Sequence, residues 1–190
     1  MSKAGEFMTV KEEFSFKSEV FDWFEAICVS LITVMLVFTL VIRSAQVEGS
    51  SMLPTLQNQD RLLLLNSAIV GVETGDIVVI TQPTAINAPL IKRVIATEGQ
   101  TVNIDFSLGQ VYVDGILIEE PYINELTKTM PSDCVDFPFT VSKGHVFVMG
   151  DNRNASSDSR NASIGEIDTR YIIGKAFFRL FPFENAGFIK

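Results

Sequence analysis

An uncharged segment near the start of the chain restricts its possible folds most strongly. Residues 26–42 carry no charged side chain, and Arg43 follows them directly. Aromatic side chains extend the segment toward the N-terminus, at Phe21, Trp23 and Phe24. Because about 20 apolar residues in a helix cross a bilayer, residues 23–43 predict one transmembrane helix. A buried core helix would show a polar stripe, and a cleavable signal peptide would have a shorter apolar core and a basic start.

The charges that flank this helix predict its orientation. Three lysines precede it, whereas only Arg43 follows it closely. Positive flanks favour the cytoplasmic side, so we expect residues 1–22 inside the cell and residues 44–190 outside it. The chain would then be a single-pass protein of the cytoplasmic membrane with the lipid bilayer as a partner. The outer part has roughly 145 residues, enough for one domain with a substantial core.

The overall charge and the rarity of metal-binding side chains exclude further classes. The net charge is −8 and the sequence pI is about 4.7, which argues against a nucleic-acid partner because phosphate binding needs a basic face. His145 is the single histidine, and Cys28 and Cys134 are far apart in the chain. These residues cannot supply the usual ligands of a zinc site, and we expect both cysteines to be unpaired. We therefore predict no metal and no cofactor.

Beyond the apolar segment, the pattern is that of β-strands. Short runs rich in Val, Ile and Leu, separated by Gly, Pro, Asn or Asp, predict strands at residues 60–65, 76–81, 90–96, 101–104, 111–118, 145–149 and 171–179. Asp114 and Gly115 suit the two-residue turn of a hairpin. Residues 119–139 contain three prolines and little periodicity, so they predict an excursion from the sheet, either a substrate-facing flap or a variable loop. The predicted fold class is mainly β, with one transmembrane helix before an antiparallel β-sheet domain.

Two side chains could form a nucleophile and its base. Ser51 lies in a turn between Gly49, which frees the backbone, and Pro54, which stiffens it. A serine hydroxyl becomes an effective nucleophile when a neighbouring base takes its proton. Lys92 interrupts an apolar strand, where burial would lower its pKa, and His145 is the other candidate base. The residues alone also allow a plain linker at Ser51 and an outward-facing lysine at position 92.

Four short motifs in a fixed order resemble those of type I signal peptidases. These are membrane-bound Ser/Lys endopeptidases that cut signal peptides from exported proteins. The motifs are SMLPTL at residues 51–56, GDIVV at 75–79, IKRV at 91–94 and GDNRNASSDSR at 150–160. FFRLFPF at residues 177–183 resembles the end of the Gram-positive branch. The resemblance runs from about residue 20 to the C-terminus and implies a β-rich catalytic domain of the signal peptidase type.

The resemblance implies a role for each of these motif residues. Ser51 would be the nucleophile and Lys92 the general base. Ser156 would accept a hydrogen bond from the Lys92 side chain, while Asp158 and Arg160 would pair and support the site. The same loop, residues 150–160, is rich in Asp and Asn, but it has Arg and Ala where a calcium loop needs oxygen ligands.

The resemblance also implies an oxyanion site and substrate pockets. The backbone N–H of Ser51 would be one oxyanion donor. Some relatives have a serine two residues earlier, where this chain has Gly49, so the second donor would be main chain or absent. Apolar positions would line shallow pockets that admit small residues at positions −1 and −3 of a signal peptide: Val47, Met52, Leu62, Val79, Leu90 and Ile91. The implied partners are preproteins that carry signal peptides.

Two other classes of protein stay open beside a signal peptidase. A self-cleaving Ser/Lys repressor-type protein shares this chemistry, but it should carry a DNA-binding module in place of a membrane span. A catalytically inactive, membrane-anchored β-domain is the other alternative. Two departures from the family pattern also stand out, because many relatives have Asp at the position of Asn154 and Gly-Leu-Pro-Gly-Asp in place of ATEGQ at residues 96–100.

Overall fold

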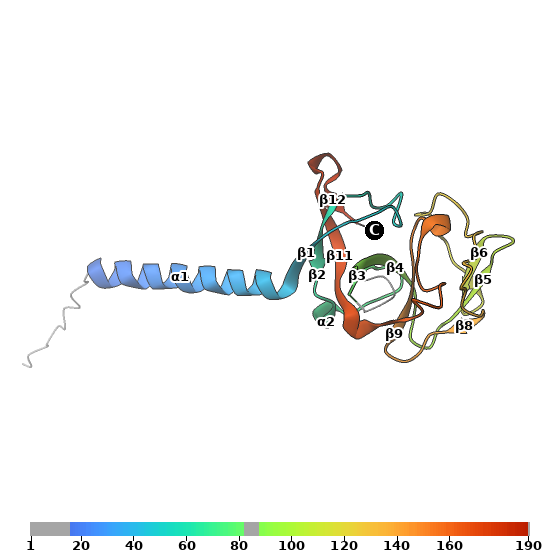
Figure 1. Cartoon of the computed structure of the whole chain (residues 1–190). Helices are drawn as coiled ribbons and strands as arrows, with labels where there is room; N and C mark the ends of the chain where they lie inside the picture. Colours follow the sequence, from blue (N-terminus) through green and yellow to red (C-terminus); the bar gives the residue numbers. More distant parts are fainter. Residues whose placement is uncertain (1–15, 82–87, 190) are drawn as a thin grey trace, which may run out of the picture. The chain divides into compact units, whose positions relative to one another are not determined.

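The computed structural model describes residues 16–81 and 88–189 (Figure 1). The chain divides into two units, Met1–Thr39 and Leu40–Lys190, and each is described by itself. Most of helix α1, Phe16–Val41, belongs to the first unit. Within it, Glu19–Val41 is the one described helix that is long and apolar enough to cross a membrane, with a mean hydropathy of 2.4. The hydroxyls of Thr33 and Thr39 donate to backbone carbonyls one turn earlier, so these polar groups are satisfied inside the helix.

Helix α1 ends at Val41, and Ile42 and Arg43 already belong to strand β1, Ile42–Gln46. The predicted span of residues 23–43 runs two residues further, because the apolar pattern gives no sign of the strand. The boundary is set by pairing with the next strand, in which Ile42 lies opposite Leu65. Asn66, directly after that strand, donates its backbone N–H to Val41 O and its side-chain amide to Leu40 O.

The second unit contains two antiparallel sheets. The larger has eight strands in the order β1-β2-β11-β3-β4-β9-β10, with β12 paired to β11. Besides β1, its strands are β2 Arg61–Leu65, β3 Ile77–Ile80, β4 Leu90–Thr97, β9 His145–Met149, β10 Ile167–Asp168, β11 Ile172–Phe181 and β12 Gly187–Phe188. The smaller sheet has the order β7-β6-β5-β8. Its strands are β5 Thr101–Asp105, β6 Gln110–Val113, β7 Ile116–Leu117 and β8 Phe139–Thr140.

The predicted mainly β, antiparallel fold class is confirmed. Each predicted strand segment overlaps an observed strand, and residues 111–118 lie in the hairpin β6–β7 around Asp114 and Gly115, which both have positive φ. Strands β1, β8, β10 and β12 were not predicted. Three of these have two residues, too few for a period to show, and all depend on pairing with a distant partner. The remaining helical elements are short: α2 Ser67–Val70, η1 Arg153–Ala155, η2 Thr169–Tyr171 and η3 Phe183–Asn185.

Strand β4 is buried on both faces. Its first seven residues are all buried, because one face packs within the larger sheet's core and the other lies near the smaller sheet. Ile95 and Ala96 share a cluster with Val102 of β5 and Phe147 of β9. Figure 1 shows the smaller sheet on the far side of β4 and β9 from β1 and β2. Any polar side chain on β4 must therefore find its partners inside the protein.

The excursion at residues 119–139 packs against the loop that follows β9. Val135 N donates to Arg160 O, and Ala162 N donates to Asp133 O. Cys134 forms an isolated bridge with Asn161, and its thiol is free, as is that of Cys28. The excursion therefore supports the loop of residues 150–163.

Candidate active site

Ser51 lies on a turn that is fixed at both ends by the core. The turn connects β1 with β2, and Val47 N donates to Asp60 O at 2.8 Å, while Gln59 N donates to Val47 O at 2.9 Å. Met52, directly after the serine, is 1% exposed and packs in the core cluster of β2 and β3. The Ser51 side chain is thus presented by a turn that cannot move without exposing apolar surface.

Lys92 comes from β4 and reaches the serine directly. Its Nζ lies 2.8 Å from Ser51 Oγ and 3.0 Å from Ile91 O, and the residue is 3% exposed. Burial lowers the pKa of Lys92, and the positive charge of Arg160 adds to this effect. The negative charges of Asp158 and Asp151 act in the opposite direction, but burial is the largest cause. A serine hydroxyl beside a lysine with a lowered pKa is the geometry of a nucleophile and its general base.

The structure corrects the predicted partner of Lys92. Ser156 Oγ is buried and has no hydrogen-bond partner among the described residues, whereas the Lys92 amine is bonded to Ser51 and to a backbone carbonyl. Ser156 nevertheless lies at the site, because a Cβ built on Gly150 would be 2.2 Å from Ser156 Oγ and 2.4 Å from Ser51 O. Only glycine fits at position 150, and its absent side chain allows Ser51 and Ser156 to approach each other.

Asp158 and Arg160 pair as expected. The guanidinium donates from Nε to Oδ1 and from Nη2 to Oδ2, both at 2.8 Å, and the two side chains are 0% and 1% exposed. Asp158 Oδ2 also accepts the backbone N–H of Gly150 at 2.9 Å. The pair therefore fixes the start of the loop and places two opposite charges where both act on Lys92.

A second buried ion pair was not assigned from the sequence. Arg93, next to Lys92 on β4, donates two bonds of 2.8 Å to the carboxylate of Asp151 and one to Gly75 O. Asp151 also accepts the hydroxyl of Thr55, which lies on the serine turn. An arginine inside a buried strand needs a carboxylate partner, so the sequence did signal that a partner exists, although not which one.

Gly49 shapes the serine turn, but its own N–H is already used. The residue has φ +89°, which favours glycine, and its N–H donates to Asn58 Oδ1 at 2.9 Å. Asn152 holds the neighbouring backbone, since its N–H donates to Ser51 O at 3.0 Å and its amide to Ser50 O at 3.1 Å. Gly49 therefore acts on the conformation of the turn.

A cavity of about 350 Å³ opens beside the Ser51–Lys92 pair. Five of the six predicted pocket residues line it: Val47, Met52, Val79, Leu90 and Ile91. Leu62 does not, because it is fully buried in the core cluster beneath. Further lining residues had not been predicted, mainly because they belong to the unpredicted strand β1 and its continuation: Ser44, Ala45, Gln46, Glu48, Pro89 and Ile173. No residue of the 119–139 excursion lines this cavity.

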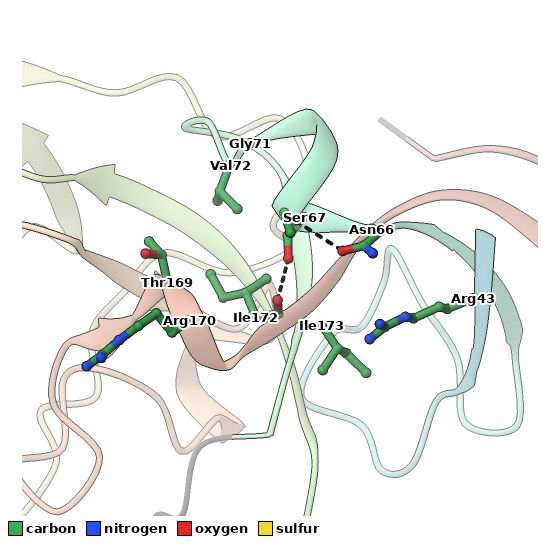
Figure 2. A pocket seen from close by; sticks show the side chains of 10 residues that line it. Arg43, Asn66, Ser67, Gly71, Val72, Thr169, Arg170, Ile172 and Ile173 are labelled. Carbon is green, nitrogen blue, oxygen red and sulfur yellow. Dashed lines mark hydrogen bonds between the residues drawn. The ribbon is translucent and has the colours of Figure 1, made fainter. Parts of the chain in front are cut away.

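Two other places in the chain lack the features of the Ser51–Lys92 site. A cavity of about 580 Å³ lies near α2 and β11, and Figure 2 shows its lining side chains, where the hydroxyl of Ser67 donates to Ile172 O. It contains none of the predicted site residues. His145 Nδ1 lies 3.0 Å from Lys143 O, and His145 does not line the cavity at Ser51. Among residues 16–81 and 88–189, no group of three or more His, Cys, Asp or Glu side chains gathers in a way that could hold a metal ion.

Comparison with known proteins identifies the family of the chain. The family described as "Signal peptidase, peptidase S26" matches residues 20–181. Signal peptidase I of Bacillus licheniformis is 36% identical over 94% of this chain and 97% of its own. Signal peptidase IB of Staphylococcus aureus (strain COL) is 31% identical over 89% and 93%.

A crystal structure of a signal peptidase I from Enterococcus faecalis V583 covers 55% of this chain and 95% of its own, with 26% identity and a TM-score of 0.44. The assignment rests on the family match and on the sequence relatives, which extend over nearly the whole chain. The chain therefore belongs to the signal peptidase family, peptidase S26, whose members are serine endopeptidases.

Proposed function

We propose that this protein removes N-terminal signal peptides from exported preproteins, with Ser51 as the nucleophile and Lys92 as the general base. The observation that carries this assignment is the 2.8 Å contact between Lys92 Nζ and Ser51 Oγ. It is supported by the burial that lowers the pKa of Lys92, since a lysine can accept a proton only in its neutral form. The relatives named signal peptidase I support the same substrate class.

The reaction follows from these positions. Neutral Lys92 takes the proton of Ser51 Oγ as the oxygen attacks the carbonyl carbon of the scissile peptide bond. The resulting ammonium returns a proton to the leaving amine when the C–N bond breaks, which leaves an acyl ester on Ser51. Lys92 then takes a proton from water, which attacks the ester, and its ammonium protonates Ser51 Oγ as the ester breaks. The backbone N–H of Ser51 is the proposed oxyanion donor.

The cavity beside the pair favours small apolar side chains. One side of its wall is made of the buried residues Val79, Leu90 and Ile91 of β3 and β4, so a bulky side chain there would have to displace packed core. We propose cleavage after small residues at −1 and −3. Efficient processing of a substrate with Phe or Leu at −1 would contradict this specificity.

Helix α1 is the proposed membrane anchor. Its apolar part, Glu19–Val41, meets the length and composition required for a span. The lysines before this apolar part favour a cytoplasmic N-terminus and a catalytic unit on the outer side of the cytoplasmic membrane. Accessibility of a cysteine-reactive probe to single-cysteine variants on either side of α1, in intact cells and in lysed cells, tests this orientation.

The deciding experiment is cleavage of a preprotein by the full-length protein in detergent. We expect Ser51→Ala and Lys92→Arg to be inert, because one removes the nucleophile and the other cannot accept a proton near neutral pH. Ser50→Ala and Lys143→Arg are matched controls on neighbouring or exposed positions and should retain activity, as should His145→Ala. Substantial activity of Lys92→Arg, or complete loss of activity in a folded His145→Ala, would show that His145 and not Lys92 is the general base.

A further inference from the structure

Tyr122, in the excursion of residues 119–139, lies close to two buried guanidinium groups. The Cζ atom of Arg93 is 3.9 Å from the centre of its ring, and that of Arg153 is 5.8 Å from it. Both distances fall within the range of cation–π attraction. Burial and the charge of Glu120 raise the pKa of Tyr122 to about 12. The phenol is therefore neutral wherever the enzyme works, and its ring acts as a fixed surface.

Arg153 connects this ring to the loop of residues 150–160. The arginine is 2% exposed, and its three nitrogen atoms have three separate acceptors: Gly150 O at 3.1 Å, Thr127 Oγ1 at 3.0 Å and the carboxylate of Glu120. Two of these acceptors belong to the excursion and one to the loop. The Arg153 side chain thus holds the two segments together.

The other side of the same loop holds the nucleophile. Asn152 bonds to the backbone carbonyls of Ser50 and Ser51, and Gly150 lies against Ser51 O. Asp151 joins Arg93 to the serine turn through Thr55. Three consecutive loop residues therefore contact the turn that carries Ser51, and Arg153 follows them directly.

We propose that Glu120, Tyr122 and Arg153 form a clamp that positions Ser51 against Lys92. This inference rests on the proposed roles of Ser51 and Lys92. The clamp residues do not line the cavity beside the nucleophile, so they are positioning residues. A buried ion pair is weak support for stability on its own, but it can hold one arrangement of neighbouring segments. Displacement of a reacting group by about 1 Å can cost on the order of 100-fold in rate.

The test is the kinetics of full-length protein in detergent on a soluble peptide that contains the cleavage site. We expect Glu120→Gln and Tyr122→Leu to lower kcat about 10- to 100-fold with KM changed less than about twofold, because substrate contacts stay intact. Tyr122→Phe keeps the ring and should restore kcat to near the wild-type value. Tyr112→Leu is the matched control, since Tyr112 lies on β6 in the smaller sheet and bonds to Gln110, and it should leave kcat unchanged.

Several outcomes would overturn the clamp. Wild-type kcat in folded Glu120→Gln and Tyr122→Leu would do so, as would a raised KM with kcat unchanged. If Glu120→Gln fails to fold, the comparison of Tyr122→Phe with Tyr122→Leu decides. Ser51→Ala separates this inference from the proposed function. An active Ser51→Ala removes the nucleophile assignment, whereas an inert Ser51→Ala beside fully active clamp variants removes the clamp alone.

Discussion

Asp158→Asn should change both the stability of the protein and the pH at which it works. The carboxylate accepts two 2.8 Å bonds from Arg160, and both side chains are completely or almost completely buried. Asparagine has the same shape and can still accept the Gly150 N–H, but it leaves the charge of Arg160 unpaired. Removing one partner of a buried ion pair costs about 3–5 kcal/mol, a large share of a typical total of about 5–15 kcal/mol.

The same substitution should move the acidic limb of the rate profile to lower pH. The negative charge of Asp158 raises the pKa of Lys92 against the larger effect of burial. Without that charge the pKa falls further, so Lys92 is neutral at a lower pH. Arg160→Met should have the opposite effect, because the positive charge of Arg160 lowers the pKa of Lys92. The two variants therefore share a loss of stability and differ in the sign of the pH shift.

The assay is kcat/KM against pH on a soluble peptide, measured well below the melting temperature of each variant. Asp168→Asn is the matched control, because Asp168 and Arg170 have the same spacing but Arg170 is 83% exposed. It should cost much less stability and leave the profile in place. The electrostatic argument would be refuted if the acidic limb moved in the same direction in Asp158→Asn and Arg160→Met. It would also be refuted if the acidic limb of Asp158→Asn moved to higher pH.

Three further predictions concern the glycine, the base and the anchor. Gly150→Ala should lower kcat by about 100-fold in peptide assays, because the added Cβ would overlap Ser156 Oγ and Ser51 O. Wild-type kinetics in this variant would show that the loop can shift to accommodate the methyl group. Lys92→Met should remove a pH dependence of stability. Because the pKa of Lys92 in the folded protein is lowered from 10.5, the stability of the wild type is highest above the unfolded pKa and decreases as the pH falls toward the folded pKa. The free energy of unfolding in urea should therefore change less with pH across this window in the variant than in the wild type. Removal of residues 1–39, which keeps β1, should preserve cleavage of a soluble peptide. It should weaken cleavage of a membrane-inserted preprotein, because the anchor raises the effective concentration of this substrate. A truncated protein that is folded but inert toward the peptide would show that α1 does more than tether the enzyme.

Local sequence patterns predicted the strands well but could not predict the environment of Lys92. Alternating and apolar runs identify a strand at residues 90–96 because pleating is a local property. Whether position 92 faces solvent depends on Ser51, which lies 41 residues earlier in the chain, and on β9, which begins at His145. The resemblance to a known family, and not the periodicity, made Lys92 the preferred base.

The errors and omissions at the site have the same origin. Ser156 was expected to accept from Lys92, but the geometry of the loop leaves that hydroxyl against Gly150. The resemblance implies that Leu62 lines a substrate pocket, whereas β2 turns it toward the core. Asp151 was missed because its partner Arg93 lies 58 residues earlier. Each of these depends on the relative position of distant segments, which a single sequence does not encode locally.

The alternation of side chains along β4 makes strand register a condition for activity as well as for packing. Lys92 lies opposite Val78 and Arg93 opposite Ile77 in β3, so the two cations point to opposite faces of one strand. A shift of one residue would bring a guanidinium, which cannot act as a base, to the serine. On the other edge of β4, the pairing with β9 contains a bulge between Val94 and Ala96, and this irregularity fixes the register at a second, independent place. Misregistered molecules would thus be catalytically dead, so the fraction of active molecules after refolding should report the accuracy of β-pairing.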